Sequence, residues 1–482
     1  MLYKHTATEL STLLKERKIT AVELIDSIFD RIEKTEDKLG NFLLLKKENA
    51  LEEAKLVDEK IARGEELGPL EGIPIAIKDN MVSKGDLTTS ASKILSNYEG
   101  VYDATVVRRL KEAGAIIIGK TNMDEFAMGS TTKTSYIKES KNPWDLDRTP
   151  GGSSGGSASS VAGGQVPLSL GSDTGGSIRQ PAAFCGIVGL KPTYGRVSRY
   201  GLMAFASSLD QIGPMGKSVE DVATLLNVIG GYDEMDATSM ELEATDFTAN
   251  LDGNIKGMKI GIPKEYFIEG LNPDIKKVTE EAIKNFEKLG AEIVPISLPN
   301  TEFAPATYYI IAPAEASSNL ARFDGVRYGY RAENYDGIMD MYVKTRSEGF
   351  GPEVKRRIMI GTYVLSAGYY DAYYKKAQKV RTLIKNDFDR AFNDVDMILT
   401  PATPGTSFKL TDNKTNIELY LEDIFTIPAN LSGIPGLVIP AGKVNGLPVG
   451  VQLLGKAFDE ATILKAGDAY EKAYTKLEMA TL

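Results

Sequence analysis

Short apolar segments alternate with helix-like segments along most of this chain. The apolar segments have the length of buried strands, and they lie at 73–78, 115–119, 166–171, 258–262, 291–296, 396–400, 437–441 and 449–454. The helix-like segments that separate several of them lie at 103–113, 273–289, 360–392 and 459–475. Alternation of this kind favours an α/β sandwich with a mostly buried sheet.

The N-terminal region has a different texture. Thr20 and Glu23 form a capping-box pattern ahead of an amphipathic run that ends near Lys38, and residues 46–63 suit an exposed helix. We therefore expect a helical lead over residues 1–65, followed by a Ser/Gly-rich core over 71–220. Because no stretch resembles an interdomain linker, we predict one domain over 1–482.

Composition excludes several classes of protein. The formal net charge of −10 disfavours a surface that binds nucleic acid through many phosphate contacts. A single cysteine, Cys185, forms no internal disulfide and fits a reducing compartment. The sequence has no secretory signal and no run of about 18 apolar residues, so we expect a cytoplasmic protein without a membrane anchor.

Two serine- and glycine-rich tracts are the main chemical signal. Residues 151–157 read GGSSGGS and residues 171–177 read GSDTGGS, yet the chain holds only one histidine, His5. A serine hydroxyl becomes a good nucleophile when a base removes its proton. If a serine reacts here, the base must be a lysine or a carboxylate.

Other motif matches fail on their structural context. Residues 114–121, GAIIIGKT, fit the P-loop pattern, but a helix-like segment precedes Gly114 and the residues between the glycines form a strand core. Gly114 is better interpreted as the glycine after a helix C-terminus. The nucleophile-elbow match at 151–155 lacks a histidine later in the chain. Cys185 lies in an apolar run and we expect it to be buried, and the sequence offers no zinc ligand set.

A lysine and two serines can be assembled into a catalytic group. The paired glycines before Ser177 allow backbone amides to converge on an oxyanion. Lys78 ends an apolar strand, and burial would have to lower its pKa by about three units from about 10.4 to make it a base near neutrality. Ser153 can pass a proton between Ser177 and Lys78. Taken alone, these residues also allow a solvated lysine and a glycine loop that serves only packing.

Three motifs resemble the amidase signature family: EGIPIAIKDN, PGGSSGGSASSVA and GSDTGGSIRQPAAFCGIVGLKPTYGRVS, within residues 71–198. The resemblance implies a single large α/β/α sandwich with a mixed central sheet. It also implies a Ser-Ser-Lys triad in which Ser177 is the nucleophile, Ser153 is a bridging serine that follows a cis peptide bond, and Lys78 is the base. The implied oxyanion hole is formed by the backbone amides of Thr174, Gly175 and Gly176, together with that of Ser177.

Further segments, at 121–129, 314–330 and 347–381, are similar to the A subunits of bacterial tRNA-dependent amidotransferases. That resemblance implies a glutaminase that supplies ammonia for conversion of Glu-tRNA(Gln), with Asp-tRNA(Asn) left open as a second acceptor. Free glutamine would contact Arg357 through its carboxylate and Asp423 through its ammonium, with Met128 and Tyr308 lining the pocket.

The same resemblance implies partners. A kinase-type B subunit would bind most of the misacylated tRNA and hold ATP and Mg, and a small C subunit would complete a heterotrimer. We expect no cofactor and no metal in this chain. The alternative is a stand-alone amidase of small or aryl amides, which shares the triad.

Overall fold

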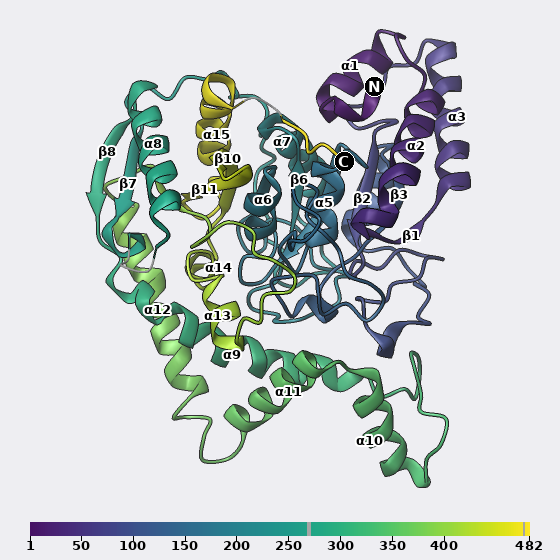
Figure 1. Cartoon of the computed structure of the whole chain (residues 1–482), viewed down its shortest axis with the longest axis vertical. Coiled ribbons are helices and arrows are strands. Elements are labelled where there is room, and N and C mark those ends of the chain that lie inside the picture. Colours follow the sequence, from purple (N-terminus) through teal and green to yellow (C-terminus); the bar gives the residue numbers. More distant parts are fainter. Residues whose placement is uncertain (268–270, 476–477) are drawn as a thin grey trace.

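A single mixed sheet of 11 strands organises the computed structural model, which describes residues 1–267, 271–475 and 478–482 (Figure 1). The strand order is β1-β3-β2-β4-β6-β5-β10-β11-β9-β7-β8. The strands are β1 (Phe42–Leu45), β2 (Pro74–Lys78), β3 (Ile116–Thr121), β4 (Leu168–Asp173), β5 (Val188–Lys191), β6 (Gln211–Gly216), β7 (Lys259–Pro263), β8 (Glu292–Ile296), β9 (Met397–Pro401), β10 (Gly436–Val444) and β11 (Leu447–Gly455).

Helices cover this sheet. They are α1 (Ala7–Lys15), α2 (Ala21–Leu39), α3 (Lys47–Arg63), α4 (Thr105–Glu112), α5 (Gly155–Ala162), α6 (Arg179–Cys185), α7 (Val219–Ile229), α8 (Pro273–Lys288), α9 (Ala304–Asn319), α10 (Gly337–Gly349), α11 (Pro352–Leu365), α12 (Tyr374–Ala391), α13 (Asn416–Leu421), α14 (Ile427–Ser432) and α15 (Glu460–Tyr474). No helix in the described part of the chain is long and apolar enough to cross a membrane.

The sheet combines parallel and antiparallel pairs. Strand β2 pairs in parallel with β3 and β4, and β7 pairs in parallel with β8 and β9. Antiparallel pairs join these two groups through β6, β5, β10 and β11. This arrangement confirms the α/β fold class with a mixed, helix-covered sheet.

All eight predicted strands are present, but three further strands were missed and one predicted helix is wrong in part. The missed strands are β1, β5 and β6. The predicted helix over 360–392 is interrupted, because Ser366 is extended and Gly368 has a φ of 86° between α11 and α12. Gly114, with a φ of 72°, follows the end of α4 as predicted.

The N-terminal lead is mostly helical and begins with two capping boxes. Thr6 caps α1 and Thr20 caps α2, each with a glutamate three residues later. The prediction of a wholly helical lead is wrong at β1, which pairs antiparallel with β3 at the edge of the sheet. The lead therefore contributes to the sheet as well as covering it.

Two apolar clusters fill the interior. One packs α2, α7 and α15 with the central strands, and the second joins α9, α12 and α14 with Met128 and Tyr308. Helices α10 and α11 extend away from the sheet at the bottom of Figure 1. Helix α11, which packs against α9, carries Arg357.

Candidate active site

The adjacent ends of two parallel strands place the lysine beside the glycine-rich loop. Lys78 is the last residue of β2, and Asp173 is the last residue of the neighbouring strand β4. Because both strands run in the same direction, their carboxyl ends meet at one edge of the sheet, where ligands bind in open α/β sheets. Ser153 and Ser154 lie immediately before α5, which packs against β4.

Lys78 is fully buried among hydroxyl groups. Its Nζ donates to Ser153 Oγ at 2.7 Å, to Ser154 Oγ at 2.8 Å and to Ser172 Oγ at 3.0 Å. The predicted contact between Lys78 and Ser153 is therefore present. The alternative of a solvated lysine is wrong.

Burial gives this amine the protonation behaviour of a base. Desolvation lowers the pKa of Lys78 from 10.5 to about 7, although the negative charges of Asp124, Asp173 and Asp210 act in the opposite direction. An amine with this pKa is substantially neutral near pH 7 and accepts a proton readily.

Ser153 and Ser154, which both accept from Lys78, differ in whether their own hydroxyl hydrogens are already used in a hydrogen bond. Ser154 Oγ donates to the Ser172 carbonyl at 3.1 Å, so its hydrogen is already engaged. Ser153 Oγ accepts from Lys78 and donates to no acceptor among the described residues. Of these two neighbouring serines, Ser153 is therefore the one whose hydroxyl proton is available for a relay. The peptide bond between Gly152 and Ser153 is cis, as the family resemblance implied.

Ser177 lies at the end of the loop between β4 and α6. Its carbonyl accepts from the Ser154 amide at 3.2 Å, which holds the two serine-rich segments side by side. Within the described residues, its hydroxyl makes no hydrogen bond to Ser153 or to another side chain. The hydroxyl of the predicted nucleophile is thus left free for a substrate, while its role stays a prediction.

The loop amides divide into engaged and free groups. The Gly176 amide donates to Asp173 Oδ1 at 2.9 Å, so it is engaged in this structure, and its place in the oxyanion hole stays a prediction. In the described structure the amides of Gly175 and Ser177 have no acceptor. The Thr174 hydroxyl donates to Asp210 at 2.7 Å, and the place of the Thr174 amide in the hole stays a prediction. The amides of Gly175 and Ser177 are therefore available to an oxyanion.

Arg357 lies in an aromatic box that the sequence did not reveal. Its guanidinium carbon is 5.5 Å from the ring centre of Phe205 and 5.6 Å from those of Tyr309 and Tyr420. Its Nε donates to Glu353 at 2.8 Å, and in the described part of the chain its two terminal nitrogens have no hydrogen-bond partner. This fork is free to bind a carboxylate through two parallel hydrogen bonds.

Asp423 has the opposite charge in the same region. Burial raises the pKa of its carboxyl well above the usual value, the charge of Glu422 raises it further, and the Arg357 guanidinium lowers it. A carboxylate in this environment gains from a bound cation, since buried charge is costly without a partner.

The predicted pocket residues are found at two places around the site. Tyr308 packs directly on the oxyanion loop, because a Cβ added to Gly175 would lie 2.8 Å from its hydroxyl oxygen. Met128 is fully buried and belongs, with Tyr308, to the apolar cluster that joins α9, α12 and α14. A cavity of about 580 Å³ reaches Arg357 and is also lined by Gly129, immediately after Met128. It gives a ligand access to Arg357 from the α10–α11 side.

The residues set aside in the sequence behave as expected. His5 is partly exposed and pairs with Glu9, and Cys185 is buried. The P-loop match forms β3, in which Ile116, Ile117 and Ile118 are extended. No cluster of metal-binding side chains occurs among the described residues.

Comparison with known proteins fits this geometry. Residues 23–464 match the family described as Amidase. The chain belongs to the amidase family. This amidase is 64% identical to the A subunit of the Glutamyl-tRNA(Gln) amidotransferase of Fusobacterium nucleatum, over 100% of this chain and 99% of the relative. It is 59% identical to the protein of that name from Heliobacterium modesticaldum, over 98% and 97%.

Solved structures share the fold. The crystal structure of the A subunit of Glutamyl-tRNA(Gln) amidotransferase from Thermotoga maritima superposes with a TM-score of 0.83 at 43% identity and covers 100% of this amidase and 99% of that chain. A bacterial aryl acylamidase of the amidase signature family has a TM-score of 0.86 at 26% identity, over 98% and 96%. The fold is therefore common to both activities, and the site must decide between them.

Proposed function

We propose that this amidase is the glutaminase subunit of a tRNA-dependent amidotransferase and generates ammonia from free glutamine. The observation that carries the proposal is the buried 2.7 Å contact between Lys78 and Ser153 beside the Ser177 loop. The full-length likeness to amidotransferase A subunits supports the choice of substrate.

The proposed reaction begins with attack of Ser177 Oγ on the side-chain carbonyl carbon of glutamine. The serine proton passes to Ser153, whose own proton passes to Lys78. The amides of Gly175 and Ser177 stabilise the oxyanion. When the carbon–nitrogen bond breaks, the proton returns through Ser153 to the leaving nitrogen, and ammonia departs. Water then attacks the glutamyl ester by the same route, which releases glutamate and restores Ser177.

Recognition of glutamine follows from the two charged residues. The free fork of Arg357 suits the α-carboxylate, and Asp423 suits the α-ammonium. A simple aryl amide carries neither group and would leave the terminal nitrogens of Arg357 and the carboxyl group of Asp423 without a ligand. This pair therefore favours an amino-acid amide over the substrate of a stand-alone amidase.

We further propose that this subunit works in the cytoplasm with the B and C subunits of a heterotrimer. ATP and Mg would act on the B subunit, which would also carry most of the contacts to misacylated tRNA. The net charge of −10 supports a division in which another subunit binds the nucleic acid.

The test is glutamate release from glutamine by the purified chain, alone and with the B and C subunits of the same organism. We expect release that increases with partners, ATP and misacylated tRNA. A Ser177→Ala variant should lose at least about 1,000-fold in kcat, because it removes the proposed nucleophile. Turnover of aryl amides without glutaminase activity in any combination would instead establish the stand-alone amidase.

A further inference from the structure

A buried ion pair encloses the loop that carries Ser177. Asp173 and Arg179 stand on either side of the loop, and both are 0% exposed. Arg179 donates to the carboxylate through Nη2 at 3.0 Å and through Nε at 3.1 Å. The carboxylate also accepts from the Gly176 and Ile178 amides at 2.9 and 3.1 Å. One carboxylate thus fixes the loop on both sides of Ser177.

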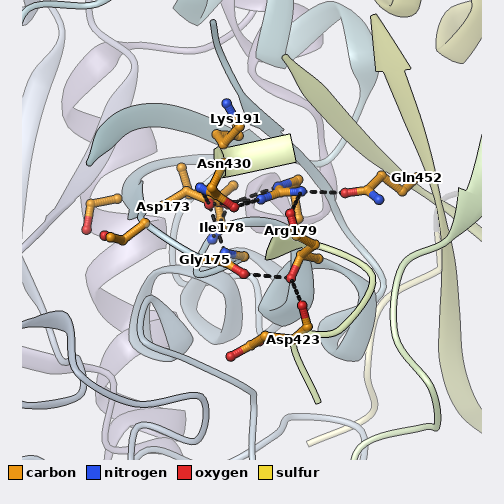
Figure 2. Close-up of polar contacts among 12 residues, drawn as sticks. Asp173, Gly175, Ile178, Arg179, Lys191, Asp423, Asn430 and Gln452 are labelled. Carbon is orange, nitrogen blue, oxygen red and sulfur yellow. Dashed lines mark hydrogen bonds and ion pairs between the residues drawn. The ribbon is translucent and has the colours of Figure 1, made fainter. Parts of the chain in front are cut away.

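The same arginine connects the loop to a distant segment (Figure 2). Its Nη1 donates to the Thr426 carbonyl at 2.9 Å, and its Nη2 donates to Asn430 Oδ1 at 2.6 Å. Asn430, on α14, also donates to Asp173 at 2.8 Å. Residues near 426, which follow Ser177 by almost 250 positions, are therefore fixed to the oxyanion loop.

Thr426 makes the most direct connection. Its hydroxyl lies 2.7 Å from the Gly175 carbonyl and 3.0 Å from the Asp423 carbonyl, and it can donate its single hydrogen to either oxygen. The approach is close, since a Cβ added to Gly176 would lie 2.2 Å from Thr426 Oγ1. Gly176 has a φ of 135°, which also requires glycine.

A short turn brings Asp423 into this connection. The amides of Thr426 and Ile427 both donate to the Asp423 carbonyl, at 3.1 and 3.0 Å. Asp423 and Thr426 therefore belong to one hydrogen-bonded turn, and the Thr426 hydroxyl of that turn contacts the loop that carries Ser177. In Figure 2, Asp423 lies below Gly175 at the lower end of the network, and Gln452 lies at its right-hand end.

We propose that Thr426 is a positioning residue that couples occupation of Asp423 by the substrate ammonium to alignment of the oxyanion loop. The proposal rests on the proposed function, because glutamine supplies the ammonium. A cation bound to Asp423 holds the 423–426 turn in one conformation. The hydrogen bond from the Thr426 hydroxyl then holds the Gly175 carbonyl in place as well. The neighbouring Gly175 and Ser177 amides are then held where the oxyanion forms.

This coupling makes an α-amino group raise the rate of reaction as well as the affinity. Interactions that gain strength only in the transition state raise kcat, whereas uniform binding lowers KM alone. A matched substrate is glutaramate, which is glutamine without its α-amino group. It retains the carboxylate for Arg357 and the scissile amide, but it leaves Asp423 without a cation.

The experiment compares three variants in the complex with the B and C subunits. Thr426→Val removes the hydroxyl at similar volume, Thr426→Ser restores it, and Thr403→Val removes another buried hydroxyl, which donates only to Gly405. With glutamine, we expect Thr426→Val to lower kcat by about 10- to 100-fold, as loss of oxyanion alignment does, with little change in KM. Thr426→Ser and Thr403→Val should stay within about threefold of wild type.

The second substrate and a double variant separate the possible outcomes. With glutaramate, Thr426→Val should change kcat by less than about threefold, and adding Thr426→Val to Asp423→Asn should have equally little effect on glutamine turnover. Equal losses on both substrates, or additive losses in the double variant, would overturn the coupling. Wild-type turnover of glutaramate at the rate of glutamine would instead overturn the proposed role of Asp423 in glutamine recognition.

Discussion

At the scale of single residues, the environment of Lys78 fits the role of the proposed base, in a chain whose one histidine, His5, pairs with Glu9. Lys78 is the last residue of strand β2 and is buried, and its amine contacts three serine hydroxyls. These contacts satisfy the amine in either protonation state, because a hydroxyl can both donate and accept. Desolvation is thus the main cause of the lowered pKa, and the nearby aspartates keep it from falling further.

The pH dependence of glutamine hydrolysis should report this pKa. Only neutral Lys78 accepts a proton, so kcat/KM should rise about tenfold per pH unit below the pKa and level off above about pH 7. Lys78→Arg retains the positive charge but has no accessible neutral form, and we expect it to lose at least about 100-fold. Initial rates between about pH 5.5 and 8.5 measure both effects. A wild-type profile that is flat across this interval would show that Lys78 is not the base.

At the scale of elements, the glycine loop depends on the ion pair between the end of β4 and the start of α6. Burial raises the pKa of Asp173, but the charge and hydrogen bonds of Arg179 outweigh burial and leave it at about 2. The carboxylate therefore stays ionised at any pH at which the enzyme works. Arg179 is equally buried, so the pair is stable only while both charges remain.

Asp173→Asn should destabilise the protein by about 3–5 kcal/mol, because it leaves the Arg179 charge buried without a counter-ion. The midpoint of urea unfolding measures the loss. Glu112→Gln, which breaks an exposed pair with Arg108, is the matched control and should cost less than about 0.5 kcal/mol. If the two variants unfolded at the same urea concentration, the ion pair would not be what holds this loop.

The same elements show where the sequence is informative about the fold. Short, largely apolar runs predict β2 and β3, and both strands are buried along their whole length. Strand β6 reads QIGPMG, and its proline and glycines are typical of loops, although it lies inside the sheet. Strand β6 forms because the fold brings it between β4 and β5, and its own sequence does not predict this pairing.

The residues of the candidate site likewise fall into those that the sequence could predict and those that it could not. Lys78, Ser153 and Ser177 lie in dense local motifs, so their types and spacing could be recognised. Asp173 and Arg179 stand within the same motif, and their charges close to Ser177 were an available signal. Thr426 and Asn430 gave no signal in the sequence. Each is an isolated polar residue on a distant segment, and it contacts the loop between β4 and α6 only after the sheet has formed.

At the scale of the whole molecule, a buried carboxylate attaches the N-terminal lead to the rest of the protein. Asp221, on α7, accepts from the Ala7 and Thr8 amides at 3.0 and 2.9 Å and from the Thr8 hydroxyl at 3.1 Å. These amides begin α1, where a helix leaves its donors unpaired and carries partial positive charge. The contact spans more than 200 residues of sequence, so it forms only when the lead packs on α7.

Asp221→Ala should therefore release α1 locally without unfolding the sheet. One buried and one partly buried helix amide lose their acceptor, which should cost about 2–4 kcal/mol. Amide hydrogen exchange across residues 7–15 should accelerate by at least about 30-fold, while exchange in β2 and β4 stays unchanged, because in the described structure the Asp221 carboxylate bonds to α1 and to neither strand. The measurement resolves the two regions in one experiment.

Asp30→Ala is the matched control, since Asp30 is an exposed aspartate on α2 within the same lead. It should leave the exchange of α1 unchanged. Faster exchange throughout the sheet of Asp221→Ala would mean that the lead and the catalytic core unfold together, so that α1 is an integral part of the cooperative unit. Confinement of the effect to α1 would show that the core around Lys78 and Ser177 maintains its geometry without this helix, as the direct contacts among its own strands and loops predict.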